Sequence, residues 1–409
     1  MTPEIRPIRE DELLAYLDAT STGFLERPDV ARLADEVRSR WELSRTWAAF
    51  EGGRICGTFR SWATEITVPG LARLPAAAVS GVSVLPTHRR RGVLRAMVAA
   101  EHAALRERGE VIGLLYASEY PIYGRFGYGS AADVAKWTLD AHGTTFRGDP
   151  QGRVEMAPAD PASRDAIRAV FDAWRLRQPG EIRRRDFVWD HDLGLLDTGW
   201  GERWKGFLAF HRDDEDIVDG YVRYHADSKW VMRQPRNEVI VDELHALTSD
   251  AYDGLWRFLA EIDWVATVRA DSRSPAEPLR WRIVNARAAS VSDVGDGLWV
   301  RLFDAPRALE ARSWERSGRV VLELIDDEAA GGRQRVELDA SPHGARCRAT
   351  RRSPDLTLHV SALGAAYLGG TRLRDAVMSA GADEHRDGAL TEADALLRTA
   401  DVPWCSTFF

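Results

Sequence analysis

Three consecutive arginines and a glycine lie between two apolar stretches in the first third of the chain: Arg89, Arg90, Arg91 and Gly92. Guanidinium groups pair well with phosphate oxygens. Glycine lets the backbone come close to a ligand because it has no Cβ atom. These residue types predict a site for an anion, chiefly a pyrophosphate, although a solvated basic turn would have the same composition.

The flanking pattern indicates how such a turn would be held. The alternating run from Val79 to Val84 predicts a strand, the helical pattern from Val93 ends before Gly109, and a second strand follows from Val111 to Tyr116. A βαβ unit of this kind places the helix N-terminus, with its free N–H groups and its dipole, at the carboxyl ends of parallel strands. The unit therefore favours the anion site over the solvated turn.

The turn and its surroundings resemble a known family. Arg89, Gly92 and Leu94 occupy the three positions of the acetyl-coenzyme A loop of GNAT N-acetyltransferases, Gln/Arg-x-x-Gly-x-Gly/Ala, and the leucine departs from that pattern. The longer strings VSVLPTHRRRGVL and ASEYPIYGRFGYG are similar to the Eis (enhanced intracellular survival) branch, in which a bulkier residue there is usual. The resemblance extends over the whole chain in length and layout, with its sharp motifs within residues 79–130 and at the C-terminal end.

The resemblance implies an α+β fold: tandem GNAT domains, the second degenerate, followed by a sterol-carrier-like α/β domain. It implies an acetyl-coenzyme A-dependent N-acetyltransferase that acts on amines of polycationic small molecules, of the aminoglycoside or polyamine type, without a metal and as a homo-hexamer. The alternative is a non-catalytic protein that keeps the fold and binds coenzyme A or a lipid. The residues expected to bind the cosubstrate are Val82, Ser83, Val84, Arg89, Arg90, Arg91, Gly92, Val93 and Ser118.

Two groups are expected to perform the proton transfers. A phenol can protonate a leaving thiolate, and two tyrosines compete for this role. Tyr123 follows the second strand, whereas Tyr128 begins the next strand, where packing is the commoner role; the family correspondence selects Tyr123. The resemblance also implies that the terminal carboxylate of Phe409 enters the active site as the base. A buried hydrophobic tail is the other reading of Phe408 and Phe409.

No motif fixes the amine site. Phe24, Glu26, Trp41 and Trp62 fall in the segment that caps the acceptor side of a GNAT domain. Their aromatic and acidic side chains suit a cationic amine. An ordinary core or surface role is the commoner one for each of these residues.

The remaining chain divides into two further parts. A second strand, helix, strand order runs from Val239 to Val268, and its turn has acidic residues where the first has arginines. We therefore predict domains over residues 1–143, 150–292 and 295–409. The alternating stretch from Leu298 to Phe303 is expected to open the third domain.

Composition excludes several other classes. The net charge of −8 disfavours nucleic-acid binding. The three cysteines are far apart, which argues against a metal site or a disulfide framework, and no apolar run approaches the ~20 residues that span a bilayer. We expect a cytoplasmic protein without a membrane partner.

Overall fold

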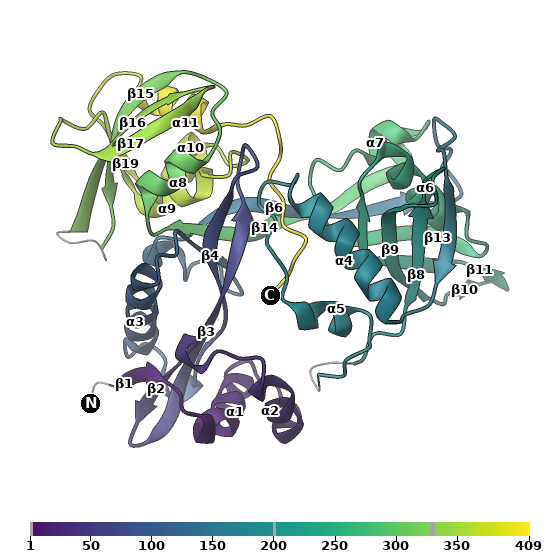
Figure 1. Cartoon of the computed structure of the whole chain (residues 1–409), viewed down its shortest axis with the longest axis horizontal. Coiled ribbons are helices and arrows are strands. Elements are labelled where there is room, and N and C mark those ends of the chain that lie inside the picture. Colours follow the sequence, from purple (N-terminus) through teal and green to yellow (C-terminus); the bar gives the residue numbers. More distant parts are fainter. Residues whose placement is uncertain (1–2, 199–201, 328–331) are drawn as a thin grey trace.

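The computed structural model describes residues 3–198, 202–327 and 332–409 (Figure 1). Its main feature is a sheet of 12 strands in the order β1-β2-β3-β4-β5-β14-β6-β13-β12-β9-β8-β7, with a separate five-stranded sheet at the C-terminal end. Helices cover both faces of the long sheet. The fold is the expected α+β arrangement, with two parts that share the long sheet and a third part with a sheet of its own.

The first part of the long sheet contains the predicted βαβ unit. Strands β4 and β5 are parallel and are joined by α3, as the apolar pattern predicts. Its elements are β1 (Glu4–Pro7), α1 (Leu13–Gly23), α2 (Val30–Arg38), β2 (Thr46–Glu51), β3 (Arg54–Thr67), β4 (Arg73–Val84), α3 (Val93–Glu107), β5 (Ile112–Tyr116) and β6 (Gly129–Asp140).

The second part repeats this order. Strands β12 and β13 are parallel and α6 connects them. Asp250 lies in the first turn of α6 and Asp253 follows it within the helix, where the first unit has arginines before its helix, and these carboxylates disfavour a pyrophosphate there. The elements are β7 (Arg153–Ala157), α4 (Pro161–Arg175), α5 (Asp186–Asp192), β8 (Phe207–Arg212), β9 (Val218–Asp227), β10 (Trp230–Val231), β11 (Gln234–Pro235), β12 (Asn237–Ala246), α6 (Ser249–Glu261), β13 (Val265–Arg273), α7 (Leu279–Arg282) and β14 (Ala289–Leu302).

A strand from the second part of the chain is inserted into the first part of the sheet. Strand β14 follows the second βαβ unit in the chain, yet it lies between β5 and β6 and pairs antiparallel with both. Strand β6 in turn pairs with β13. The stretch from Leu298 to Phe303, expected to open the third domain, is therefore mostly the end of a strand of the long sheet. The predicted domain boundaries themselves stay predictions.

The third part packs a small sheet against four helices. Strands β15 and β18 are parallel, and the other pairs in this sheet are antiparallel. The elements are α8 (Ala305–Ala311), β15 (Gly318–Ile325), β16 (Arg333–Ser341), β17 (Gly344–Ala349), β18 (Leu356–His359), α9 (Val360–Ala366), α10 (Leu373–Ala380), β19 (Ala382–Glu384) and α11 (Ala389–Leu397). The chain then leaves this domain, and its last residues run back between the first two parts (Figure 1).

Candidate functional site

A fork between two parallel strands forms the centre of the candidate site. Strands β4 and β5 pair only from Ala76 to Ala78 on β4. Beyond that point Gly81 has φ 61°, and the pairing register with β3 shifts by one residue there. A bulge of this kind bends a strand, so β4 leaves β5 and its edge backbone groups face an opening. The sequence identified this stretch as a strand but could not show the bulge.

Val82, Ser83 and Val84 lie on β4 beyond the fork. The Ser83 hydroxyl is 2.9 Å from that of Thr58 on β3, and Ser83 is buried. The Ser83 side chain therefore forms its hydrogen bond within the sheet. The backbone of this stretch is the part that could meet an extended ligand, as an added strand would. Ser118 is exposed just beyond β5.

The arginine turn leads into the N-terminus of α3. Arg90 and Gly92 have φ 63° and 83°, and Gly92 caps the 15-residue helix without a side chain of its own. The first N–H groups of a helix have no intrahelical acceptor, so those from Val93 onward join the helix dipole in favouring an anion. All three arginines of the turn are exposed. The geometry suits an anion such as a phosphate.

The three arginines do not have equivalent surroundings. The Arg91 guanidinium pairs with Glu51 at 2.5 Å, and this ion pair holds the pKa of the Glu51 carboxyl below its usual range. The Nε atom of Arg89 is 3.4 Å from the Val84 carbonyl oxygen. Among the described residues, the Arg90 side chain has neither an ion pair with a carboxylate nor a hydrogen bond to a backbone carbonyl oxygen. Its charge is therefore the most available to a ligand.

We expect Arg90→Ala to raise the Kd of acetyl-coenzyme A about 5- to 20-fold, because one charge-assisted contact to phosphate is lost. Calorimetric titration measures the effect directly. Arg91→Ala is the matched comparison and should change the Kd less, since Arg91 already pairs with Glu51. Equal losses in the two variants would contradict this distinction.

The two competing tyrosines lie on the α3 side of the sheet but differ in their contacts. The Tyr128 hydroxyl is 3.2 Å from Nε2 of the buried His102. Tyr123 is 6% exposed and packs edge-on against Tyr128, and burial with the nearby Glu119 raises its pKa to about 12. Tyr128 is thus engaged in the core. The catalytic role of Tyr123 stays a prediction.

The C-terminal tail is held by a buried carboxylate. Glu181 accepts hydrogen bonds from the Ser406 N–H at 2.7 Å, the Ser406 hydroxyl at 2.7 Å and the Thr407 hydroxyl at 2.6 Å. Glu181 is itself fixed because residues 180–183 run along β3, with an Ile66–Ile182 bridge. Arg184 donates to the Thr407 hydroxyl at 2.9 Å. The tail is therefore anchored to both of the first two parts of the chain.

The last residue reaches the fork from the face of the sheet opposite α3. The ring of Phe409 meets Trp62 of β3 at 5.3 Å and Tyr116 of β5 at 5.1 Å between ring centroids. The Tyr116 hydroxyl donates to the Thr407 carbonyl at 3.0 Å. Phe408 is 80% exposed. A hydrophobic tail that only filled the core would bury both phenylalanines, so the contacts favour a defined position for the final residue.

The acceptor-side candidates divide into two pairs. Trp41 and Trp62 lie together around Arg60, whose Cζ atom is 4.1 Å and 5.0 Å from their ring centroids. Phe24 is 40% exposed and Glu26 is also exposed, in the loop after α1. The last residue of α1, Gly23, packs directly against the Ser83 side chain, which puts this loop beside β4.

Sequence reasoning missed several residues of this region: Arg60, Tyr116, Glu181, Arg184 and Arg185. Arg60 and Trp62 are two residues apart on β3 and therefore lie on the same face of the strand. This spacing is visible in the sequence. The partners of Glu181 lie more than 220 residues away in the chain. No local pattern could have connected them.

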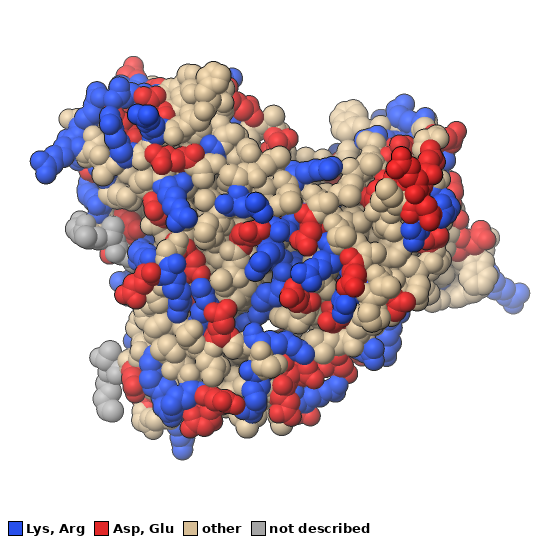
Figure 2. Space-filling model, viewed as in Figure 1, with Lys and Arg blue, Asp and Glu red and all other residues tan. Residues whose placement is uncertain are grey.

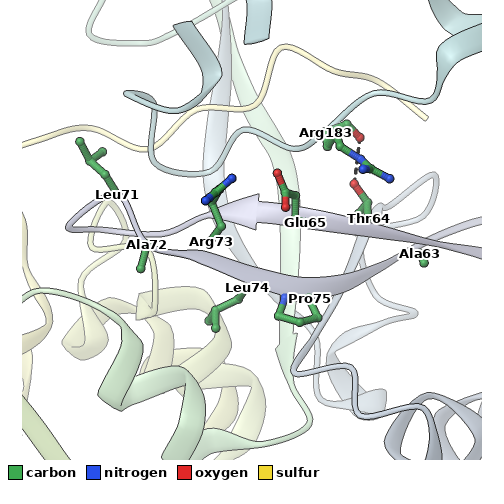
Figure 3. A pocket seen from close by; sticks show the side chains of 9 residues that line it. All are labelled: Ala63, Thr64, Glu65, Leu71, Ala72, Arg73, Leu74, Pro75 and Arg183. Atoms are coloured by element: carbon green, nitrogen blue, oxygen red, sulfur yellow. Dashed lines mark hydrogen bonds between the residues drawn. The ribbon is translucent and has the colours of Figure 1, made fainter. Parts of the chain in front are cut away.

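A separate cavity of about 610 Å³ lies along the β3–β4 hairpin (Figure 3). Figure 3 shows Thr64 and Arg183 joined where residues 180–183 cross the hairpin, with the Thr64 hydroxyl donating to the Arg183 carbonyl at 2.8 Å. None of the predicted site residues lines this cavity. We assign it no part in the chemistry.

Across the described residues, no three His, Cys, Asp or Glu side chains are grouped so that they could hold a metal ion. The described helices include none that combines the length and the apolar character needed to cross a membrane.

Comparison with protein families divides the chain into three matches. Residues 4–131 and residues 180–302 match two models of the acetyltransferase (GNAT) domain. Residues 305–406 match the sterol carrier protein domain. The second match ends with β14, in agreement with the place of that strand after the second βαβ unit in the chain.

Individual relatives extend over most or all of the chain. An uncharacterized N-acetyltransferase of Streptomyces griseus is 42% identical over 100% of both chains. The N-acetyltransferase Eis of Mycobacterium tuberculosis is 33% identical over 87% of this chain and 84% of its own. The crystal structure of Eis1 from Mycobacterium abscessus superposes with a TM-score of 0.86 at 31% identity, over 99% of this chain and 100% of that one.

Proposed function

Because the chain belongs to the Eis-like GNAT N-acetyltransferases, we propose that it transfers an acetyl group directly from acetyl-coenzyme A to an amine of a small molecule, with Tyr123 as the acid and the Phe409 carboxylate as the base. Membership of the GNAT family implies the use of acetyl-coenzyme A. The observation that carries the residue assignment is the position of Phe409, whose ring contacts Trp62 of β3 and Tyr116 of β5, the two strands that flank β4.

The cosubstrate would be held at its two ends. Its pyrophosphate suits the Arg89–Gly92 turn, where Arg90 and the first N–H groups of α3 are available. Its pantetheine arm suits the backbone edge of Val82 to Val84, which β5 does not pair, with Ser118 just beyond β5. Such a placement would bring the thioester to the fork, with Tyr123 on the α3 side of the sheet and Phe409 on the other.

Transfer forms a bond between the amine nitrogen and the acetyl carbon and breaks the bond from that carbon to sulfur. Tyr123 donates its proton to the departing sulfur, and its raised pKa of about 12 keeps the phenol protonated at neutral pH. An α-carboxylate with a pKa near ~3.5 is a weak base. The Phe409 carboxylate therefore acts by holding the ammonium and accepting its proton through water.

The resemblance leads us to propose an acceptor of the aminoglycoside or polyamine type, and a cytoplasmic homo-hexamer. An acidic chain of net charge −8 and an exposed Glu26 are compatible with a cationic acceptor. Light scattering during gel filtration tests the assembly.

Thiol release from acetyl-coenzyme A, with kanamycin or spermine as acceptor, tests the activity. We expect release that depends on the amine, and a product that gains one or more acetyl groups by mass spectrometry. No release with a broad panel of amines, together with tight binding of lipid or coenzyme A, would instead support the non-catalytic alternative.

A further inference from the structure

Two arginines lie against one tryptophan on the acceptor side of the fork. The Cζ atom of Arg185, just before α5, is 4.1 Å from the centroid of the Trp62 ring, and that of Arg60 is 5.0 Å from it. Both arginines are half-buried. Within the described part of the chain, neither guanidinium forms an ion pair or a hydrogen bond. Two like charges thus share one aromatic surface without an anion.

Arg184, the neighbour of Arg185 in the chain, shows how the charge of a buried arginine is usually compensated. Arg184 is buried, and its guanidinium pairs with Glu243 at 2.5 Å and donates to the tail. Half-buried arginines are normally compensated in this way, because desolvation of an unpaired charge is costly. Arg60 and Arg185 depart from that rule at the one place where a substrate is expected.

The nearby carboxylates already have partners. Glu42 pairs with Arg45 at 3.1 Å. Asp186 pairs with Arg168 and Asp190 pairs with Arg164, both at 2.9 Å. Neither arginine therefore has an ion pair with a carboxylate among the described residues; Glu42 acts on Arg185 only at longer range, and the terminal carboxylate belongs to Phe409, whose ring contacts Trp62.

Electrostatics within the pair agree with this picture. Burial, and then the neighbouring Arg60, lower the pKa of Arg185 to about 9. Burial lowers the pKa of Arg60 to about 10. Both guanidinium groups are charged at neutral pH, and a bound anion would relieve the unfavourable environment that lowers both values.

The pair also lies close to the expected reaction centre. Trp62 pairs in register with Ala78, the last residue of β4 that pairs with β5, and its ring touches that of Phe409. Arg185 and Phe187 line a cavity of about 600 Å³ beside α5. Figure 2 shows Lys and Arg side chains together with Asp and Glu side chains around a hollow in the middle of this face.

We propose that Arg60 and Arg185 bind an oxyanion of the acceptor, so that the molecule acetylated carries a carboxylate or phosphate group as well as its amine. This inference rests on the proposed acetyl transfer and is the alternative to the polycationic acceptor that the resemblance suggests; matched acceptors decide between the two. The planar guanidinium suits either oxyanion, and the rings of Trp62 and Phe187 offer an apolar surface to the carbon chain between the two groups.

Matched acceptors test the proposal. Lysine and cadaverine differ only in a carboxylate, and glucosamine 6-phosphate and glucosamine differ only in a phosphate. We expect kcat/KM to be at least about 10-fold higher for the acidic member of one pair, the size of one charge-assisted contact. The pair that responds identifies the oxyanion as a carboxylate or a phosphate.

Variants connect the preference to the two arginines. Arg60→Gln and Arg185→Gln should each abolish it, mainly through KM, while Arg60→Lys and Arg185→Lys should keep part of it because they keep the charge. Arg183→Gln is the control, since this exposed arginine lines the other cavity. Circular dichroism confirms that each variant is folded. A higher kcat/KM for spermine or kanamycin that the glutamine variants leave unchanged would overturn the proposal.

Binding of simple anions separates this inference from the proposed activity. Calorimetric titration with glutarate and with inorganic phosphate requires no catalysis, and we expect saturable binding of one of them that is lost in Arg60→Gln and Arg185→Gln. Binding of this kind without thiol release from any amine would refute acetyl transfer but keep the anion site. No binding of either anion, together with no preference for acidic acceptors, would refute the site.

Discussion

Tyr123→Phe is expected to lower kcat by about 10²- to 10⁴-fold, the usual contribution of a positioned general acid. The Kd of acetyl-coenzyme A should change little, because the arginine turn that is expected to bind the pyrophosphate lies elsewhere in the fold. Single-turnover measurements with saturating cosubstrate separate the chemical step from binding. A variant of full activity would remove Tyr123 from its role.

Tyr128→Phe is the matched control for this variant. Its hydroxyl contacts the buried His102, so the substitution should cost stability, about 1 kcal/mol for one hydrogen bond, and leave kcat within a few-fold of the wild type. The pH profile adds a second readout. Because the pKa of Tyr123 is raised to about 12, the phenol loses its proton only well above pH 10. A decline in wild-type kcat near pH 9 that disappears in Tyr123→Phe would contradict the raised pKa, and the same decline in both enzymes would belong to another group.

Extension of the chain by two residues beyond Phe409 is expected to reduce kcat by about 10²-fold or more, in the range of a lost general base. Two residues can move the carboxylate by up to ~7 Å, while the Ser406 and Thr407 anchors on Glu181 remain. The melting temperature should therefore hardly change. The same two residues added at the N-terminus serve as the control, and an extended enzyme of normal activity would exclude the terminal carboxylate.

Glu181→Gln tests the tail independently, without a change in its length. Loss of the charge weakens three hydrogen bonds to Ser406 and Thr407. We expect lower kcat, an unchanged Kd for acetyl-coenzyme A, and faster removal of Phe409 by carboxypeptidase. Unchanged kcat with a released tail would show that the position of the tail does not matter for turnover.

The local part of this site could be predicted from the sequence. Alternating apolar residues, the arginines before Gly92 and the helical spacing after it depend on neighbouring residues, and the strand-turn-helix unit formed as expected. The same reasoning placed Leu298 to Phe303 at the start of the third domain, because alternation identifies a strand but not its partner. The partner of a strand depends on which strand edges elsewhere in the fold are unpaired. Here β5 and β6 each pair with β14, which lies between them.

The sequence by itself thus determined the order of the elements, the family and the turn that suits a pyrophosphate. Only the tertiary structure decided that Glu181 meets Ser406, that Phe409 lies between Trp62 and Tyr116, and that Arg60 and Arg185 share a ring without an anion. The physical reason is the range of the interactions. Helix, turn and strand preferences act over a few residues, whereas burial and charge compensation depend on groups that folding brings together from distant parts of the chain.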